Sequence, residues 1–257
     1  MYKKAGSIKI RKTTVVLLVI FILLVSSSVF ILLNLTSLNY FYITHREYKI
    51  YGGLTEELKG SGLYEDMESG KSFCFLGDSI TCGSATYGIP WYQPFIPYIK
   101  GDIFNLSKAG WLVQDLIDSA NEIPETDIYV IAIGINDVLF ADETKAAASA
   151  GVFADRCRQL SDIITSISPN AKIYFIAPWP FYDFEKKYTD RADQFRAELA
   201  HWCNSTDYIY YINPEPYITS VINEKGMEKY MQNTFHPNAP NGIGLFCYAV
   251  LKADYEQ

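Results

Sequence analysis

The sequence predicts an α/β fold in which helices cover both faces of a parallel sheet. Short apolar runs of strand length alternate with segments of helical periodicity over residues 72–253. Such alternation is typical of parallel sheets, because each strand needs a helical crossover to return to the same edge, and these crossovers are right-handed. A second observation is that the loops after the first four predicted strands, and the loop before the last predicted helix, each carry an unusual set of residues.

Five segments have the length and the apolar composition of buried strands. They are residues 72–76, 103–106, 127–133, 172–177 and 208–212. We expect helices at residues 91–99, 112–121, 145–168, 192–204 and 242–253. A single domain of roughly 185 residues follows from these boundaries, which is large enough to bury a core of its own.

A long apolar segment precedes this domain. Residues 13–44 contain no charged side chain, and about 20 apolar residues cross a bilayer as a helix. Five basic residues precede it, which places the amino terminus in the cytoplasm under the positive-inside rule; they are Lys3, Lys4, Lys9, Arg11 and Lys12. We therefore expect a basic cytoplasmic tail (1–12), a transmembrane anchor (13–44), a stalk (45–71) and an extracytoplasmic domain (72–257).

Two other interpretations of the apolar segment are open. It is also compatible with a cleaved signal peptide, with residues 15–25 as the apolar region, or with a buried core helix. The apolar run continues through residues 29–33, which favours a retained anchor. Residues 1–6 resemble a linker left by recombination cloning, but the remaining basic residues before the segment predict the same orientation.

Charge and motif content narrow the function classes. Residues 13–257 carry 17 Lys and Arg (the 22 of the chain less the five before residue 13) against 29 Asp and Glu, a net charge of −12. This charge argues against nucleic acid or anionic lipid as a partner of the outer domain. The five cysteines show no zinc-site spacing, and no phosphate loop or dinucleotide motif is present, so no metal or cofactor is expected. The oligomeric state is not predicted.

Ser79 is the candidate nucleophile. It stands directly after the first predicted strand, in the sequence Phe-Cys-Phe-Leu-Gly-Asp-Ser-Ile-Thr of residues 73–81, and parallel sheets bind ligands at the carboxyl ends of their strands. A serine hydroxyl needs a base to take its proton. Of the three histidines, His45 abuts the apolar segment and His201 lies in a helical pattern, so His236, in a loop before proline, is the candidate base.

Acyl transfer also needs hydrogen-bond donors aimed at the developing oxyanion. Gly110, after the second strand, can present a backbone N–H, and Asn136, after the third, can present its side-chain amide. The Ser79 N–H is a third donor. Singly, Gly110 is equally a helix-entry glycine and Asn136 a turn asparagine. The convergence of five such loops at one edge of the sheet is the stronger signal.

Four blocks of sequence resemble the SGNH, or GDSL-type, hydrolase superfamily over residues 72–253. They are Gly77-Asp-Ser-Ile80, Gly110, Gly134-Ile-Asn-Asp137 and His236-Pro237. The resemblance implies a flavodoxin-like, three-layer α/β/α fold with a five-stranded parallel sheet. It also implies Ser79 as nucleophile, His236 as base, and Gly110 and Asn136 as oxyanion donors. Members of the superfamily are esterases, lipases, carbohydrate O-deacetylases and some O-acetyltransferases.

One position departs from the family pattern. The family usually has an aspartate three residues before the histidine, where this chain has Asn233. In serine proteases the change from Asp to Asn at the equivalent place costs about 10⁴ in kcat. Asn233 is expected to accept the Nδ1–H of His236 through its carbonyl oxygen, without a charge. We favour a slower Ser–His–Asn site or dyad over replacement by another carboxylate or a carbonyl, and over a degenerate binding domain.

Aromatic residues flank the predicted site. Tyr87, Trp91 and Trp179 are candidates for substrate binding, although such residues are more often packing residues. Together these features predict a membrane-anchored esterase that cleaves acyl esters through a seryl-acyl intermediate. The location suggests an O-acetylated carbohydrate of the cell envelope. An O-acyltransferase with the same nucleophile and a catalytically inactive glycan-binding module are the alternatives.

Overall fold

The computed structural model describes residues 20–31, 46–141 and 149–257 of the chain. The chain divides into two units, Met1–Arg46 and Glu47–Gln257. In the first unit, residues 20–31 form a helix, and the rest of the predicted anchor at 13–44 lies outside the described residues. No helix in the described part of the chain combines the length and the apolarity needed to cross a bilayer.

The second unit is built on a five-stranded parallel sheet with the order β2-β1-β3-β4-β5. The strands are β1 (Phe73–Gly77), β2 (Ile103–Ser107), β3 (Ile128–Ala132), β4 (Lys172–Ile176) and β5 (Ile209–Ile212). All five predicted strands are confirmed to within one residue at each end. The central strands β1 and β3 are buried along their whole length, which explains their continuous apolar sequence.

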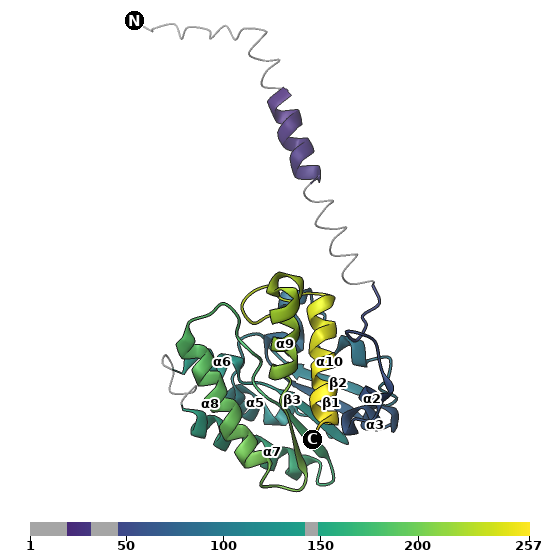
Figure 1. Cartoon of the computed structure of the whole chain (residues 1–257), viewed down its shortest axis with the longest axis vertical. Helices are drawn as coiled ribbons and strands as arrows, with labels where there is room; N and C mark the ends of the chain where they lie inside the picture. The colour runs from purple at the N-terminus through teal and green to yellow at the C-terminus, as the bar shows by residue number, and fades with distance from the viewer. Residues whose placement is uncertain (1–19, 32–45, 142–148) are drawn as a thin grey trace, which may run out of the picture. The chain divides into compact units, whose positions relative to one another are not determined.

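Helices cover the two faces of this sheet. They are α2 (Glu56–Lys59), α3 (Gly62–Glu68), α4 (Ser79–Cys82), α5 (Val113–Asp118), α6 (Ile135–Phe140), α7 (Ala150–Ile167), α8 (Lys186–Cys203), α9 (Glu215–Lys225) and α10 (Asn241–Tyr255). In one group α7 packs against α5 and α8, and in the other α10 packs against α2, α3 and α9 (Figure 1). Right-handed crossovers place the two groups on opposite faces, because the chain leaves β1 in one direction and β3 in the other.

Two helical predictions need correction. The helix expected at 91–99 is only a 3-10 turn, η2 (Gln93–Phe95), because Pro94 and Pro97 lack the N–H that a continuous helix requires. The helix expected at 192–204 begins six residues earlier, at Lys186. The short 3-10 turns η1 (Ser84–Thr86), η3 (Ala120–Glu122) and η4 (Met227–Lys229) complete the described elements.

The segment expected to be a stalk belongs to the compact unit. Leu58 of α2 and Leu63 and Met67 of α3 are at most 1% exposed in the hydrophobic core. Asp66 of α3 accepts hydrogen bonds from Lys172 and Tyr174 of β4. The predicted boundary at residue 72 is therefore wrong, and the domain begins near residue 47. Its buried residues are separated by charged ones, which gives this stretch a polar composition.

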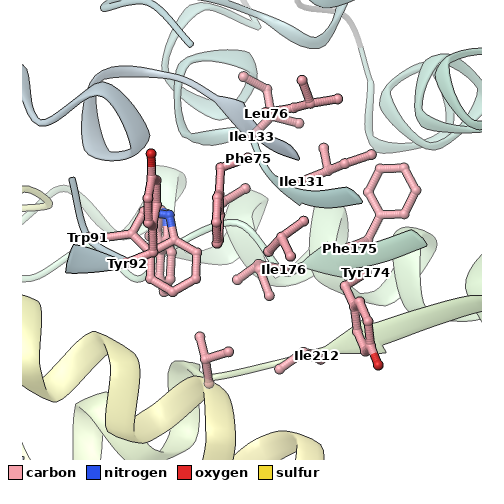
Figure 2. Close-up of a cluster of buried hydrophobic side chains, with 14 of the residues drawn as sticks. Phe75, Leu76, Trp91, Tyr92, Ile131, Ile133, Tyr174, Phe175, Ile176 and Ile212 are labelled. Atoms are coloured by element: carbon pink, nitrogen blue, oxygen red, sulfur yellow. The ribbon is translucent and has the colours of Figure 1, made fainter. Parts of the chain in front are cut away.

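Aromatic side chains fill the core beside β1. Phe75 stacks on Tyr92 with ring centroids 3.6 Å apart, and Trp91 meets Phe75 edge-on at 6.2 Å. Figure 2 shows Trp91 and Tyr92 beside Phe75, with Ile131 and Ile176 of the neighbouring strands in the same cluster. This packing holds β1 rigidly, and β1 leads directly into the predicted site.

Candidate active site

Ser79 begins helix α4, immediately after strand β1. Gly77 ends the strand where a Cβ would collide with the Thr81 side chain and the Ala132 carbonyl, so no larger residue fits. Asp78 caps the helix by accepting a hydrogen bond of 3.0 Å from the Ile80 N–H. Ser79 is 6% exposed. The turn therefore presents the hydroxyl at the carboxyl edge of the sheet from a fixed backbone.

The structure brings the predicted nucleophile and base together. The Nε2 atom of His236 lies 2.8 Å from Oγ of Ser79, although the two residues are 157 positions apart in the sequence. Burial lowers the pKa of His236, so the ring is neutral at physiological pH. His201 is exposed on α8, and His45 lies outside the described residues.

A short loop carries His236. The Gln232 N–H donates to the His236 carbonyl at 2.9 Å, and the Asn238 N–H donates to the Tyr230 carbonyl at 2.8 Å. Met231 and Pro237 pair as an antiparallel bridge across the loop. These bonds close the loop on itself and set the direction in which the imidazole points.

Asn233 lies beside the imidazole, but in an orientation that differs from the expected one. Its Oδ1 accepts hydrogen bonds from the backbone N–H groups of Phe235 (3.1 Å) and His236 (2.8 Å). Its Nδ2 is the atom that faces Nδ1 of His236, at 3.0 Å. The expectation that the Asn233 oxygen accepts from Nδ1–H is therefore wrong, because two backbone donors already occupy that oxygen.

The two predicted oxyanion donors come from neighbouring loops. Asn136 is buried in the first turn of α6, and its Nδ2 donates to the Trp111 carbonyl at 3.0 Å. This bond orients the amide and leaves its second N–H for an oxyanion. Gly110, the residue before Trp111, has φ +82° with open space where a Cβ would lie, so backbone conformation is what requires glycine there.

Two buried carboxylates lie next to this half of the site. Asp78 precedes Ser79, and Asp137 follows Asn136 and accepts from the Val113 N–H at 3.2 Å. Burial raises the pKa of each to about 7, and the Asp78 charge contributes to the shift of Asp137. Each of these carboxyl groups accepts a hydrogen bond from a backbone N–H group near the nucleophile or the predicted oxyanion donors. Nδ1 of His236, in contrast, faces the amide of Asn233.

Two of the three aromatic residues predicted to bind substrate are core residues. Trp91 is fully buried and Trp179 is 1% exposed. Their rings contact each other at 5.3 Å, and Trp179 stacks on Phe246 at 4.5 Å. That prediction is wrong for both, because helix α10 covers this face of the sheet. Tyr87 is 53% exposed and adopts a left-handed backbone with φ 57°, so it stays a candidate.

A different aromatic group extends from the histidine, and sequence reasoning missed most of it. The Phe235 ring lies 4.4 Å from the His236 ring and 5.8 Å from Phe181. Phe181 contacts Phe184 at 5.5 Å, which contacts Tyr188 at 4.7 Å. Phe184 is 36% exposed. The available signals were Phe181, in the loop after the fourth predicted strand, and Phe235, which directly precedes the candidate base.

Among the residues that the structure describes, no cluster of three or more His, Cys, Asp or Glu side chains could hold a metal ion. All five cysteines are free thiols.

Solved structures with the same fold come from several bacteria. A protein described as a GDSL-like lipase from Parabacteroides merdae is 19% identical with a TM-score of 0.62, over 73% of this chain and 97% of that one. Axe2, an acetylxylan esterase from Geobacillus stearothermophilus, is 20% identical with a TM-score of 0.59, over 74% and 96%. A member of the lipolytic G-D-S-L family from Veillonella parvula is 16% identical with a TM-score of 0.59, over 70% and 96%. At these identities the likeness shows the fold alone.

The sequence also matches a known family directly. The profile of the GDSL-like Lipase/Acylhydrolase family matches residues 75–240, a span that runs from strand β1 past His236. No curated protein matches the sequence. The profile covers more than half of the chain and includes both Ser79 and His236, which the structure places in contact. The chain therefore belongs to the GDSL-like lipase/acylhydrolase family and is an esterase of that family.

Proposed function

We propose that the protein hydrolyses O-acetyl esters of carbohydrates through a seryl-acyl intermediate on Ser79. The observation that carries this proposal is the 2.8 Å contact between Ser79 Oγ and His236 Nε2. In the proposed reaction, Oγ attacks the ester carbonyl while its proton passes to the imidazole, and the alcohol leaves with that proton. Water then cleaves the acyl-enzyme, with His236 acting again as base.

The developing oxyanion needs hydrogen-bond donors. The second N–H of the Asn136 amide and the backbone N–H groups of Gly110 and Ser79 are the proposed donors. Asn136 is held by the Trp111 carbonyl before substrate arrives. Donors that are oriented in advance do not have to reorganise during the reaction, which is why each is worth roughly 10²–10³ in rate.

Two observations support a sugar acetate as the substrate. Axe2, which has the same fold, is described as an acetylxylan esterase. In this chain, Phe184 and its aromatic neighbours offer a partly exposed surface that begins at the His236 ring. Exposed aromatic rings suit the apolar faces of sugar rings, with polar groups at the edges.

The membrane anchor is part of the same proposal and rests on the sequence of residues 1–44. We expect the full chain to stay in the membrane pellet after an alkaline wash, and a chain without residues 13–44 to be released. Release of the full chain by the wash would contradict the anchor. Protease protection in sealed vesicles would show on which side residues 47–257 lie.

Acetate release by the full chain tests the reaction itself. We expect acetate from acetylated xylo-oligosaccharides and from p-nitrophenyl acetate, and loss of that release in Ser79→Ala. Equal release by Ser79→Ala would contradict the proposal. Binding of oligosaccharide without any turnover would indicate the inactive glycan-binding module. Transfer of acetyl to an added acceptor sugar in preference to water would indicate the O-acyltransferase.

A further inference from the structure

The orientation of the Asn233 amide is determined by the backbone around it. Its Oδ1 accepts from the N–H groups of Phe235 at 3.1 Å and of His236 at 2.8 Å. If the amide were reversed, its NH₂ group would point at these two N–H groups and both hydrogen bonds would be lost. The NH₂ group of Asn233 is therefore directed at the imidazole.

This orientation decides which ring nitrogen carries the proton. The Nδ2 atom of Asn233 is 3.0 Å from Nδ1 of His236, and a side-chain amide nitrogen can only donate. Nδ1 must then be the acceptor, and the single proton of a neutral imidazole must sit on Nε2. We propose that Asn233 is a positioning residue that holds His236 as the Nε2–H tautomer in the resting protein, so that the ring donates to Ser79.

The consequence for catalysis is that the resting ring cannot take the Ser79 proton. Nε2 must first lose its proton to solvent and Nδ1 must gain one, after which Nε2 accepts from Oγ as the new C–O bond forms. The imidazolium so formed would direct Nδ1–H at the Asn233 NH₂ group, which places two donors face to face. Asn233 therefore lacks the negative charge of an aspartate, and in addition its NH₂ group disfavours the protonated ring because it faces Nδ1–H. This kinetic consequence rests on the proposed function.

An aspartate in the same place would have the opposite effect. One carboxylate oxygen would keep both backbone hydrogen bonds, and the other would accept from Nδ1–H. That tautomer leaves Nε2 free to accept from Ser79, and the negative charge stabilises the imidazolium. Asn233 is exposed, so the added charge is compatible with folding. Gln232 is also exposed, and its change to Glu adds the same charge to the same loop at the position next to Asn233.

Nitrogen NMR of the full chain in detergent tests the tautomer directly. Histidine labelled with ¹⁵N is observed at a pH where His236 is neutral, and its signals are assigned with a His236→Gln variant. We expect Nδ1 to show the shift of a bare nitrogen and Nε2 that of a protonated one, and the reverse in Asn233→Asp. We expect kcat/KM to rise by up to about 10⁴ in Asn233→Asp. In Gln232→Glu it should change by less than about threefold, because an exposed charge is screened.

Two results would overturn the inference. One is a protonated Nδ1 in the wild-type chain, and the other, in a chain that does cleave esters, is an Asn233→Asp protein that is no faster than Gln232→Glu. The spectra are recorded on resting protein and do not depend on turnover. An Nε2–H ring in a chain that cleaves no ester would therefore support the tautomer while it refutes the proposed function.

Discussion

The two halves of the active site are stabilised in different ways. Ser79 and Asn136 lie on the first turns of helices that follow buried strands, and two carboxylates, Asp78 and Asp137, are buried beside them. His236 lies on a surface loop that is closed by its own backbone hydrogen bonds. The residue that faces its ring is a neutral, exposed amide, Asn233.

The proposed nucleophile and oxyanion donor therefore lie on helix starts fixed by buried strands, whereas the proposed base lies on a loop and faces an amide. Burial holds the strand ends rigidly, and the Trp111 carbonyl orients Asn136 before substrate binds. The His236 loop places Nε2 within hydrogen-bond distance of Ser79 Oγ. The group that faces Nδ1 is an NH₂ donor, however, where an aspartate would present an acceptor.

The largest expected effect appears when the nucleophile is removed in two backgrounds. In serine proteases, loss of the nucleophile costs roughly 10⁶ in kcat and the Asp→Asn change about 10⁴, and such losses are not additive. Ser79→Ala should therefore cost about 10⁶ in the Asn233→Asp protein and about 10² in the wild-type chain. Hydrolysis of p-nitrophenyl acetate measures both. Equal losses in the two backgrounds would show that His236 works as well with the amide as with a carboxylate.

The next effect belongs to the oxyanion donors. Asn136→Ala should lower kcat by roughly 10²–10³, because it removes a buried, preoriented N–H. KM should change little, since the interaction strengthens only in the transition state. Steady-state kinetics separate the two constants, with thermal unfolding as the control for folding. A raised KM at constant kcat would assign Asn136 to ground-state binding instead.

Two single substitutions distinguish the roles of the buried aromatic residues from those of the exposed ones. Trp179→Phe should lower the free energy of unfolding by about 1–3 kcal/mol and leave KM unchanged, because Trp179 lies in the core. Phe184→Ala should do the reverse, with a KM for acetylated oligosaccharide raised roughly three- to tenfold and stability within about 0.5 kcal/mol. For each variant, urea denaturation measures the free energy of unfolding and steady-state kinetics measure KM. A KM change in Trp179→Phe alone would restore its predicted substrate role.

The last prediction concerns the pH dependence of stability. The pKa of Asp137 is about 7 in the folded chain and roughly 3.9 when unfolded, so the native state binds more protons between these values. This contribution to the free energy of unfolding is complete below about pH 4 and is lost as the pH rises through 7. Asp137→Asn should lose less stability between pH 5 and pH 8 than the wild type. Equal losses, measured by urea denaturation, would contradict a buried, protonated Asp137.

Much of the fold could be predicted from the sequence because its central strands are buried on both faces. Continuous apolar runs such as residues 128–132 are typical of strands inside a parallel sheet, and all five strands are confirmed. The pairing of Ser79 with His236 was also predicted, since Ser79 follows a strand end and His236 is the histidine that stands in a loop near the predicted site. Residues 47–71 were misplaced because only a few apolar side chains, such as Leu58 and Leu63, connect them to the core.

The remaining features depend on contacts that no local pattern encodes. Trp179 follows a strand end, as a substrate-binding residue would, but α10 covers it. The direction of the Asn233 amide depends on two backbone N–H groups that meet its oxygen only once the loop has folded. The sequence motif identifies the residue at position 233, but the surrounding backbone determines which of its side-chain atoms faces His236.

The reactivity of Ser79 toward a fluorophosphonate probe tests whether His236 activates Ser79 and whether Asn233 restrains that base. Intact-mass spectrometry on the full chain would follow labelling in the wild type, in His236→Gln and in Asn233→Asp. We predict labelling at Ser79 that is slow in the wild type, faster in Asn233→Asp and absent in His236→Gln. Folded wild-type chain that takes up no label, or equal rates in all three proteins, would contradict an activated Ser79 whose base is restrained by Asn233.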